Sequence, residues 1–356
     1  MKIVLALDSF KGSLSSSEAA MCAREGILRV CPQAEIKVVP VADGGEGTIE
    51  ALACGENARK VSISVHGPLG EPLMADDAVM GNAIAVVELA KACGLPLVPA
   101  ALRNPEKTST FGMGEQIRHA IDGGARRFLL GIGGSATNDG GMGLLQALGW
   151  RFLDENGNAL APCGEILARI REIDAAQADG RLKDCVFEVA CDVDNPLCGP
   201  NGAAHVYAPQ KGATPAQVLS LDEGLRHFGA LTEKTTGVCV LEYPGAGAAG
   251  GVGAACLAFL KARLRRGIDC VLDAVNFDSC LNGADWVVTG EGRLDRQSLM
   301  GKTPQGVASR AQKKGIPVVA LAGAVEADAA ALRRAGIVAA FAIGRGPLPL
   351  DLALRP

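Results

Sequence analysis

The sequence predicts a two-domain α/β protein. Both ends of the chain are expected to form a doubly wound parallel domain, with a mixed α/β domain inserted between them. The length is the first observation, because 356 residues suggest two domains of about 100–200 residues each. Short apolar strands also alternate with helical stretches near both ends, which is typical of a parallel sheet. In the middle, tight turns between strands favour antiparallel pairing.

The amino-terminal part follows the order strand, loop, helix twice. Lys2–Leu7 is predicted to be a buried strand, and Ser15 and Glu18 form a capping box for a helix that ends near residue 30. Glu35–Val41 is predicted to be a second strand, and a helix is expected after the polar segment Ala42–Thr48. Two such units in a row indicate a parallel sheet.

The carboxyl-terminal part has the same order of elements. Asp285–Thr289 is predicted to be a strand, Gly290–Thr303 a polar loop and Pro304–Lys314 a helix. Pro317–Ala322 and Val338–Ile343 are predicted to be two further strands. We therefore expect both chain ends to contribute to one domain.

The middle region has a different pattern. Its predicted strands are Lys60–Val65, Leu73–Met80, Ala83–Leu89, Arg127–Gly131 and Val186–Cys191. Turns at Gly67–Gly70 and at Gly81-Asn82 favour antiparallel pairing of the first three. We expect residues 61–274 to form the inserted domain, residues 1–60 and 275–356 to form the other, and an active-site cleft to lie between them.

The composition excludes several classes of partner and of location. A net charge of -4 and an aromatic content of 4% provide no basic or base-stacking surface for nucleic acid or anionic lipid. The longest apolar stretch, Ala83–Leu102, contains Glu88 and Lys91, so no membrane-spanning helix is expected. The opening apolar run is too short for a secretion signal. Because no cysteines form a C-x-x-C pair, we expect reduced thiols in a cytoplasmic protein.

Glycine-rich polar segments follow several predicted strands. Glycine accounts for 46 of the 356 residues, nearly twice the usual share of about 7%. The segments are Asp8–Gly12, Asp43–Gly47, Gly131–Gly141, Cys191–Asn195 and Thr289–Asp295. Because ligands of open α/β sheets bind at the carboxyl ends of strands, these segments predict a ligand site.

The segment Gly131–Gly141 predicts contact with phosphate. Consecutive glycines let backbone amides approach an anion, and the helix that follows would add its positive end. Ser135, Thr137 and Asn138 carry groups that can donate to phosphate oxygens. The alternative is a glycine-rich turn in which Asp139 caps the helix.

The polar residues of these segments, together with Lys211 and Lys302 outside them, suit phosphoryl transfer. That chemistry needs carboxylates that hold Mg²⁺ or accept a hydroxyl proton, and cations that neutralise the transferred charge. The carboxylates are Asp8, Asp43, Glu46, Asp139, Asp192, Asp194, Glu291 and Asp295, and the cations are Lys11, Lys211, Arg293 and Lys302. Any single carboxylate could instead be a helix cap or a surface charge.

Asp192 is the first candidate for the group that accepts the hydroxyl proton. It follows the strand Val186–Cys191, and Asp194 lies two residues further on, where an extended chain would direct both to one side. Asp43 and Asp8 are rivals, because both also follow strands. A carboxylate that is not the base could hold Mg²⁺.

One motif indicates a different function. Gly245–Gly250 matches the G-x-G-x-x-G pattern of dinucleotide-binding folds, and Asp269 or Asp273 could supply the acid that binds the ribose. We favour close helix packing or an anion turn, because Pro244 interrupts the exit from the strand expected at Val238–Tyr243. No complete β-α-β unit is evident there.

A set of motifs runs in order along nearly the whole chain. The motifs are Asp8–Ser13, Val41–Thr48, Gly131–Gly141, Cys191–Leu197, Pro209–Gly212, Pro244–Gly253, Thr289–Asp295 and Gly301-Lys302. They closely resemble those of the bacterial class I glycerate kinases. The resemblance implies phosphorylation of D-glycerate by ATP to 2-phosphoglycerate, with Mg²⁺. It also implies a flavodoxin-like domain and a second domain similar to restriction endonucleases.

The resemblance and the residues together give the candidate roles. The candidate catalytic residues are Asp192, Lys11 and Asp43; those for substrate are Asp8, Ser9 and Arg293; those for Mg²⁺ are Asp194 and Glu46; those for ATP are Gly133, Gly134, Ser135, Asn138, Asp139, Gly290, Glu291 and Lys302. Lys11 and Arg293 are the cations that a carboxylate substrate needs, although Lys11 could be a solvated loop charge. The alternatives are a nicotinamide-dependent dehydrogenase and a non-catalytic small-anion sensor.

The expected partner is the small-molecule substrate, with no nucleic acid and no membrane, and a homo-oligomer is left open. Members of this family usually continue with a further helix after the last strand. Because this chain stops at Leu350–Pro356, we expect the core of the last domain to be less well covered.

Overall fold

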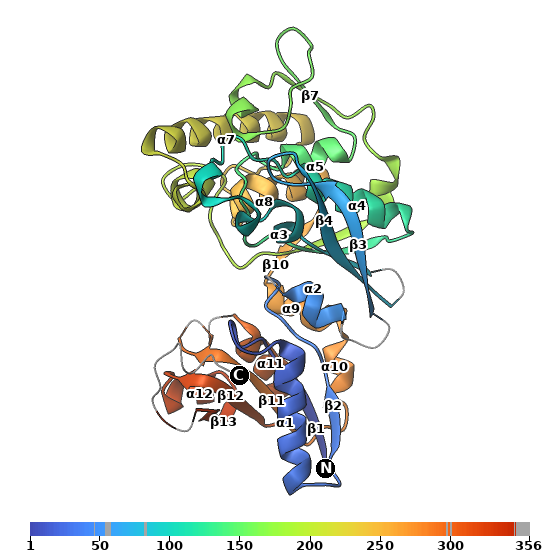
Figure 1. Ribbon diagram of the computed structural model, residues 1–356, viewed down its shortest axis with the longest axis vertical. Coiled ribbons are helices and arrows are strands. Elements are labelled where there is room, and N and C mark those ends of the chain that lie inside the picture. Colours follow the sequence, from blue (N-terminus) through green and yellow to red (C-terminus); the bar gives the residue numbers. More distant parts are fainter. Residues whose placement is uncertain are drawn as a thin grey trace. The chain divides into compact units, whose positions relative to one another are not determined.

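The computed structural model describes residues 1–45, 47–53, 58–81, 84–296, 298–299, 301–344 and 346. The chain divides into two compact units, which we call the terminal unit (Met1–Ala58 with Arg266–Pro356) and the inserted unit (Arg59–Arg265). Both are α/β (Figure 1). No helix in the described ranges has the length and hydropathy needed to cross a membrane. The candidate metal ligand Glu46 and the chain end Leu350–Pro356 lie outside these ranges.

The terminal unit, where the structure describes it, is built on a five-stranded parallel sheet in the order β13-β12-β11-β1-β2. The strands are β1 (Lys2–Leu7), β2 (Glu35–Val38), β11 (Trp286–Leu294), β12 (Val318–Val325) and β13 (Ile337–Ala342). The helices are α1 (Ser16–Val30), α2 (Thr48–Ala53), α9 (Gly267–Ala274), α10 (Phe277–Cys280), α11 (Thr303–Gln312) and α12 (Ala329–Arg334). Blue β1 and β2 lie beside the orange β11 to β13 in Figure 1, so both chain ends contribute strands to one sheet.

Both faces of this sheet are covered. Ile3, Leu5 and Leu7 of β1 pack in one apolar cluster with residues of α1. Val4 and Ala6 are fully buried as well, and side chains alternate along a strand, so these two face the other side. Helix α11, which packs against β1, β11 and β12, covers that side. Burial on both faces is typical of a doubly wound parallel sheet.

Strand β11 is longer than predicted. Gly290–Thr303 is expected to be a loop, but the strand continues to Leu294 and pairs with β12 over this part. Glycine makes the close pairing possible, since a Cβ on Gly290 would lie 2.1 Å from the carbonyl oxygen of Leu321. Glu291 therefore projects from a strand and not from a loop.

The inserted unit has two sheets among its described residues, one with six strands in the order β10-β9-β6-β5-β4-β3 and one formed by β7 and β8. The strands are β3 (Ala58–His66), β4 (Pro72–Met80), β5 (Ile84–Glu88), β6 (Arg127–Gly131), β7 (Arg151–Leu153), β8 (Glu172–Asp174), β9 (Val186–Ala190) and β10 (Arg263–Arg265). As predicted, β4 and β5 are antiparallel, whereas β5, β6, β9 and β10 are parallel. The carboxyl ends of these four strands therefore meet at one edge.

Helices surround the six-stranded sheet. The α-helices are α3 (Leu89–Cys93), α4 (Phe111–Asp122), α5 (Met142–Ala147), α6 (Ala203–Tyr207), α7 (Pro215–Thr236) and α8 (Ala248–Phe259). The 3-10 helices are η1 (Leu95–Leu97), η2 (Ala100–Leu102), η3 (Gly164–Arg169), η4 (Gly180–Asp184) and η5 (Pro209–Lys211). The core of this unit contains residues of α4, α5, α7 and α8 together with β5, β6 and β9.

The second boundary between the units differs from the predicted one. Helix α9 is expected in the inserted domain, which would end at residue 274, but it belongs to the terminal unit. The contact of Gly267 with the loop after β2 explains this, since a Cβ on Gly267 would lie 1.8 Å from the carbonyl oxygen of Asp43. Such close approach of two backbones cannot be read from spacing along the chain.

The strand predicted at Val238–Tyr243 is absent. The backbone amides of Val240 and Leu241 instead donate to Oε1 of Glu233, at 2.7 and 3.0 Å. A side chain of α7 thus takes the place of a neighbouring strand as the hydrogen-bond partner.

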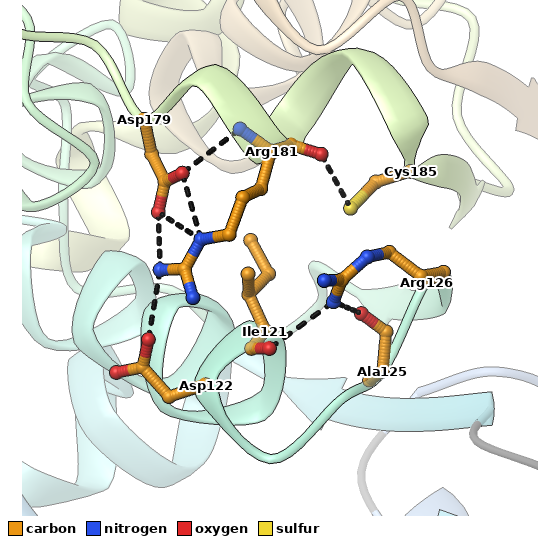
Figure 2. A network of polar contacts seen from close by, with 7 residues as sticks. All are labelled: Ile121, Asp122, Ala125, Arg126, Asp179, Arg181 and Cys185. Carbon is orange, nitrogen blue, oxygen red and sulfur yellow. Dashed lines mark hydrogen bonds and ion pairs between the residues drawn. The ribbon is translucent and has the colours of Figure 1, made fainter.

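A network of polar contacts fixes the amino-terminal ends of β6 and β9 (Figure 2). Arg181 of η4 pairs with Asp179 at 2.6 Å and with Asp122 of α4 at 2.7 Å. Arg126 donates to a carbonyl oxygen at the end of α4, and its own carbonyl accepts from the amide of Val186 at the start of β9. The network therefore anchors the ends of the strands that lie away from the glycine-rich loops.

Candidate active site

In the terminal unit, predicted site residues meet where β1 ends beside β11. Leu7 and Gly290 are paired in register, and the amide of Asp8 donates to the carbonyl of Gly290 at 2.9 Å. The strand order changes direction between these two strands, and such a switch point is where open α/β sheets bind ligands. Asp8, Gly290 and Glu291 therefore lie where a ligand site is expected.

Asp8 is a buried carboxylate with 9% of its surface exposed. It accepts hydrogen bonds from the hydroxyl of Thr303 at 2.5 Å and from the amide of Ser9 at 2.7 Å. Burial raises the pKa of Asp8, with a further increase from the charge of Asp43, while the hydrogen bonds and the charge of Lys11 lower it. Thr303 was not predicted as a site residue, because only the fold brings it to the end of β1.

Glu291 is a second acidic group with a perturbed environment. Burial raises its pKa, as does the charge of Asp8, while a hydrogen bond with Ser298 and the charge of Lys302 oppose the increase. Its Oε1 atom is buried and has no hydrogen-bond partner among the described residues. Asp43 lies after β2 and accepts from an amide of its own loop at 3.0 Å. The structure thus brings the predicted acidic and basic residues of this unit within electrostatic range.

A polar hollow lies beside these residues. Ser9 and Lys11 line it together with Gly12–Ser15, and its volume is about 460 Å³. Lys11 is exposed, as a ligand-binding cation must be. Arg293 is exposed too, but its guanidinium pairs with the carboxylate of Glu326 at 2.6 Å. Lys11 is therefore the better placed of the two predicted substrate-binding cations.

In the inserted unit, Gly131–Gly141 follows β6 as predicted, and only its tip is exposed. Gly133 and Gly134 are exposed, whereas Ser135–Gly141 are buried. Gly134 has a φ of +72°, a conformation that residues with side chains rarely adopt. Its carbonyl accepts from the amide of Leu95 at 2.9 Å, which holds the tip. The loop presents a fixed glycine tip that an anion could approach.

Asp139 is fully buried behind this tip. Its carboxylate accepts from the amide and hydroxyl of Thr110, both at 2.8 Å, and from the amides of Gly141 at 3.1 Å and Gly143 at 3.2 Å. Burial raises the pKa of Asp139, and these donors oppose the increase. The first amides of α5 are therefore not free for an anion, contrary to the expectation, because that of Gly143 donates to this carboxylate and that of Leu144 to the hydroxyl of Thr110.

Lys211 is a buried lysine that contacts the same loop. Its Nζ donates to Oγ of Ser135 at 2.8 Å and to the carbonyl oxygen of Thr137 at 2.6 Å. Burial lowers the pKa of Lys211 to about 7. The hydroxyl of Thr137 and both side-chain polar atoms of Asn138 are buried without a partner in the described part of the chain. The sequence marks Lys211 only as one cation among several.

Asp192 and Asp194 follow β9 as predicted, and both are exposed. The loop that carries them is fixed by Asn195, whose Oδ1 accepts from the hydroxyl of Tyr207 at 2.6 Å. No cluster of three or more metal-binding side chains is found within the described residues. A Mg²⁺ ion often needs only one or two carboxylates, because phosphates and water complete its shell. These carboxylates fit that requirement.

The glycines of Gly245–Gly250 pack against both loops. A Cβ on Gly247 would lie 2.2 Å from the carbonyl oxygen of Pro196, and one on Gly250 would lie 2.2 Å from that of Thr137. Close packing of backbones therefore accounts for this G-x-G-x-x-G pattern, without a dinucleotide.

Comparison with known proteins identifies the family. Residues 3–356 match the family model described as "Glycerate kinase family". The chain belongs to the glycerate kinase family. The resemblance seen in the motifs is thereby confirmed, and the protein is a kinase, for which ATP is the phosphate donor.

Relatives and a solved structure match along nearly the whole chain. Glycerate kinase of Bacillus subtilis (strain 168) is 49% identical over 356 residues, covering 100% of this chain and 93% of the relative. Glycerate 2-kinase of Escherichia coli (strain K12) is 46% identical over 356 residues, with the same coverage of 100% and 93%. A crystal structure of a protein from Salmonella typhimurium LT2 has a TM-score of 0.92 and 46% identity, covering 99% of this chain and 93% of that one. The mixed α/β architecture is thus that of a solved family structure.

The buried Asp8 gives a testable pH dependence. Because folding raises its pKa, Asp8 binds more protons in the folded protein than in the unfolded chain between its unfolded pKa of about 4 and its folded pKa. The stabilisation from Asp8 is present in acid and is lost as the pH rises through its folded pKa. Asp8→Asn removes this term, so the Tm of the variant minus that of the wild type should increase from about pH 4 to about pH 7. Thermal denaturation at several pH values measures the difference.

Asp328→Asn is the matched control in the same unit. The amide of Ala331 donates to Asp328 and lowers its pKa, so this carboxylate stabilises the fold above its unfolded pKa. The Tm difference for Asp328→Asn should therefore become more negative as the pH rises. If the Tm difference for Asp8→Asn stays constant or falls as the pH rises, burial does not raise the pKa of Asp8.

Proposed function

We propose that the protein transfers the γ-phosphoryl group of ATP to the 2-hydroxyl of D-glycerate, which yields 2-phosphoglycerate. The observation that carries the proposal is the match to the glycerate kinase family over residues 3–356. The position of the hydroxyl is supported by the relative from Escherichia coli, which is named glycerate 2-kinase and is 46% identical. We further propose a cytoplasmic location, for which the free thiols of the described cysteines are one support.

The finer fold assignments belong to the same proposal. The order β2-β1-β11-β12-β13 of the terminal unit corresponds to the order 2-1-3-4-5 of flavodoxin-like sheets. This supports a flavodoxin-like terminal unit. For the inserted unit we keep the likeness to restriction endonucleases, for which its mixed six-stranded sheet among the described residues is the support.

We assign the glycerate contacts to the hollow at the end of β1. Glycerate carries a carboxylate and two hydroxyls, so its site needs a cation and hydrogen-bonding groups. Lys11 and Ser9 line the hollow and supply these groups, and Asp8 positions Ser9 by accepting its amide at 2.7 Å. Arg293 pairs with Glu326 at 2.6 Å, which leaves only part of its guanidinium for a substrate carboxylate.

Candidate nucleotide contacts occur in each unit, and each set is assigned by itself. The exposed Gly133 and Gly134 would allow backbone approach to phosphate, with Ser135, Asn138 and Asp139 shaping the loop behind them. Gly290, Glu291 and Lys302 are the assigned contacts in the terminal unit. Measurements of nucleotide binding test the assignment of these three residues and of the glycine tip.

We assign Asp192 as the base that accepts the proton of the glycerate hydroxyl. An alcohol is a weak nucleophile at neutral pH unless a positioned group accepts its proton, and a carboxylate does so in other kinases. Asp192 is exposed, whereas Asp8 is buried; Asp43 is a further candidate. Asp194, and Glu46 by sequence, would hold Mg²⁺, which supplies neutralisation of the phosphate charge.

The two alternatives are less well supported. The family match does not favour a dehydrogenase, and the glycines of Gly245–Gly250 are explained by packing. A non-catalytic anion sensor would bind its ligand without turnover. ATP consumption that requires both glycerate and Mg²⁺ separates the three possibilities.

The product test is phosphorus NMR of a reaction with ATP, Mg²⁺ and D-glycerate. A phosphate on carbon 2 couples to one proton and gives a doublet, whereas a phosphate on carbon 3 couples to two and gives a triplet. We expect the doublet. A triplet would show that the 3-hydroxyl is phosphorylated instead. If no product forms that depends on glycerate, the proposed kinase activity toward glycerate is wrong.

Asp192→Asn tests the assigned base, because it keeps the shape of the side chain and removes its charge. We expect kcat to fall by about 100-fold or more, with the KM for ATP little changed. Steady-state kinetics with both substrates measure this. If ATP affinity collapses instead and excess Mg²⁺ restores turnover, Asp192 is a metal ligand and not the base.

Gly134→Val tests the glycine tip. A side chain at this exposed position would block backbone approach to an anion, so nucleotide-dependent turnover should be lost while the protein stays folded. Gly124→Val is the matched control, because Gly124 has a φ of +92° with nothing within 4 Å of its Cβ position and should carry similar strain without loss of activity. Wild-type kinetics in folded Gly134→Val would disprove the assignment of the tip.

A further inference from the structure

Lys211 combines deep burial with contacts to the glycine-rich loop. Its side chain is 2% exposed, and its Nζ donates to the Oγ of Ser135 and to the carbonyl oxygen of Thr137. It forms no ion pair with any described residue within 4.0 Å. Burying an ammonium group without a close counter-ion is costly. An apolar side chain of the same length would fill the space at lower cost, so the fold alone does not account for a lysine here.

The position of Lys211 relates it to the exposed tip. Ser135, which it holds, is the next residue after Gly133 and Gly134. The opposite side of this segment is held as well, since the amide of Ala136 donates to the carbonyl of Cys93 at 2.9 Å. Lys211 therefore supports the loop directly behind the part that solvent can reach.

A second observation points to a ligand at this segment. Both polar side-chain atoms of Asn138 are buried and have no partner within the described residues, and the same holds for the hydroxyl of Thr137. Asn138 is completely buried. Unsatisfied polar atoms are rare in native interiors and indicate a bound group or water that completes them. The hydroxyl of Thr137, the side-chain amide of Asn138 and the ammonium group of Lys211 thus all lie in or against the loop that carries the glycine tip.

We propose that Lys211 is a positioning residue of the nucleotide-phosphate site, which holds Ser135 and Thr137 in place and supplies positive charge behind the glycine tip. The inference rests on the proposed function, in which this loop binds the phosphates of ATP. Lys211 acts through the loop and does not itself reach solvent. A phosphate bound at the tip interacts favourably with the protonated lysine.

Proton uptake on binding is the signature of this arrangement. Burial lowers the pKa of Lys211 to about 7, so at about pH 8 about nine-tenths of it is neutral in the free protein. A bound polyanion favours the charged form, and Lys211 should then take up close to one proton per ATP. The charged groups on the segments around it are Asp139, whose charge raises its pKa, and Arg103, whose backbone lies against Gly212.

The experiment is calorimetric titration of the full chain with ATP and Mg²⁺, without glycerate, at about pH 8 in buffers of different ionisation enthalpy. Wild type should show uptake of close to one proton. Lys211→Met should lose this uptake and bind ATP at least about tenfold more weakly, with a smaller change in the KM for glycerate. Lys234→Met, at an exposed lysine of α7, should behave as wild type in both measurements.

Two outcomes overturn the proposal: unchanged ATP affinity in folded Lys211→Met, or equal proton uptake in this variant and wild type. If Lys211→Met does not fold, Ser135→Ala carries the test, because it keeps the lysine and removes one of its two acceptors. It should keep the proton uptake and weaken ATP binding, and unchanged affinity would refute the positioning role. If the wild-type protein binds ATP with proton uptake but does not phosphorylate glycerate, the proposed function is refuted and the role of Lys211 is not.

Discussion

The buried carboxylate of Asp139 is the interaction on which the inserted unit's loop depends. It accepts from Thr110 at the start of α4 and from Gly141 and Gly143 at the start of α5, so one side chain joins two helices and the loop between strand and helix. A buried carboxylate is costly unless donors surround it. Because its donors come from separate elements, the cost of the charge is offset only when all of them are in place. The geometry of the glycine tip follows from this requirement.

Glycine determines how closely the segments around this loop approach. Gly250 lies where a Cβ would meet the carbonyl of Thr137, and Gly247 where it would meet that of Pro196. In the terminal unit Gly290 allows β11 to approach β12 in the same way. The high glycine content is thus explained in part by backbones in direct contact and in part by exposed tips. The two uses look identical in the sequence, and only burial separates Gly133 and Gly134 from the packing glycines.

Much of the architecture could be predicted because it depends on local signals. The capping box of Ser15 and Glu18 sets the start of α1, and the apolar runs of β1 and β9 are strands as expected. The strand at Val238–Tyr243 was mispredicted, because the side chain of Glu233, seven and eight residues earlier at the end of α7, accepts from two of its amides. Apolar composition cannot reveal which partner a backbone amide will find.

The candidate site shows the same division. Residues that follow strands, such as Asp8 and Asp192, were proposed as site residues from their position alone. The contact of Thr303 with Asp8 was not predicted, and Lys211 was named only as one cation among several, since their contacts join positions far apart in the sequence. The capping role of Asp139 was considered only as an alternative, although its hydrogen bonds to α5 are local. Burial, which decides between a ligand contact and a support, depends on the assembled fold.

The division of the chain into a continuous inserted unit and a discontinuous terminal unit has a consequence for synthesis on the ribosome. Arg59–Arg265 is complete before β11 has been made, so this unit can fold while the chain is still growing. Strands β1 and β2 must wait for β11, because β1 pairs with it. At about 5–20 residues per second, the wait lasts for tens of seconds or less. During that time the apolar residues of β1 lack the neighbouring strand with which they pair.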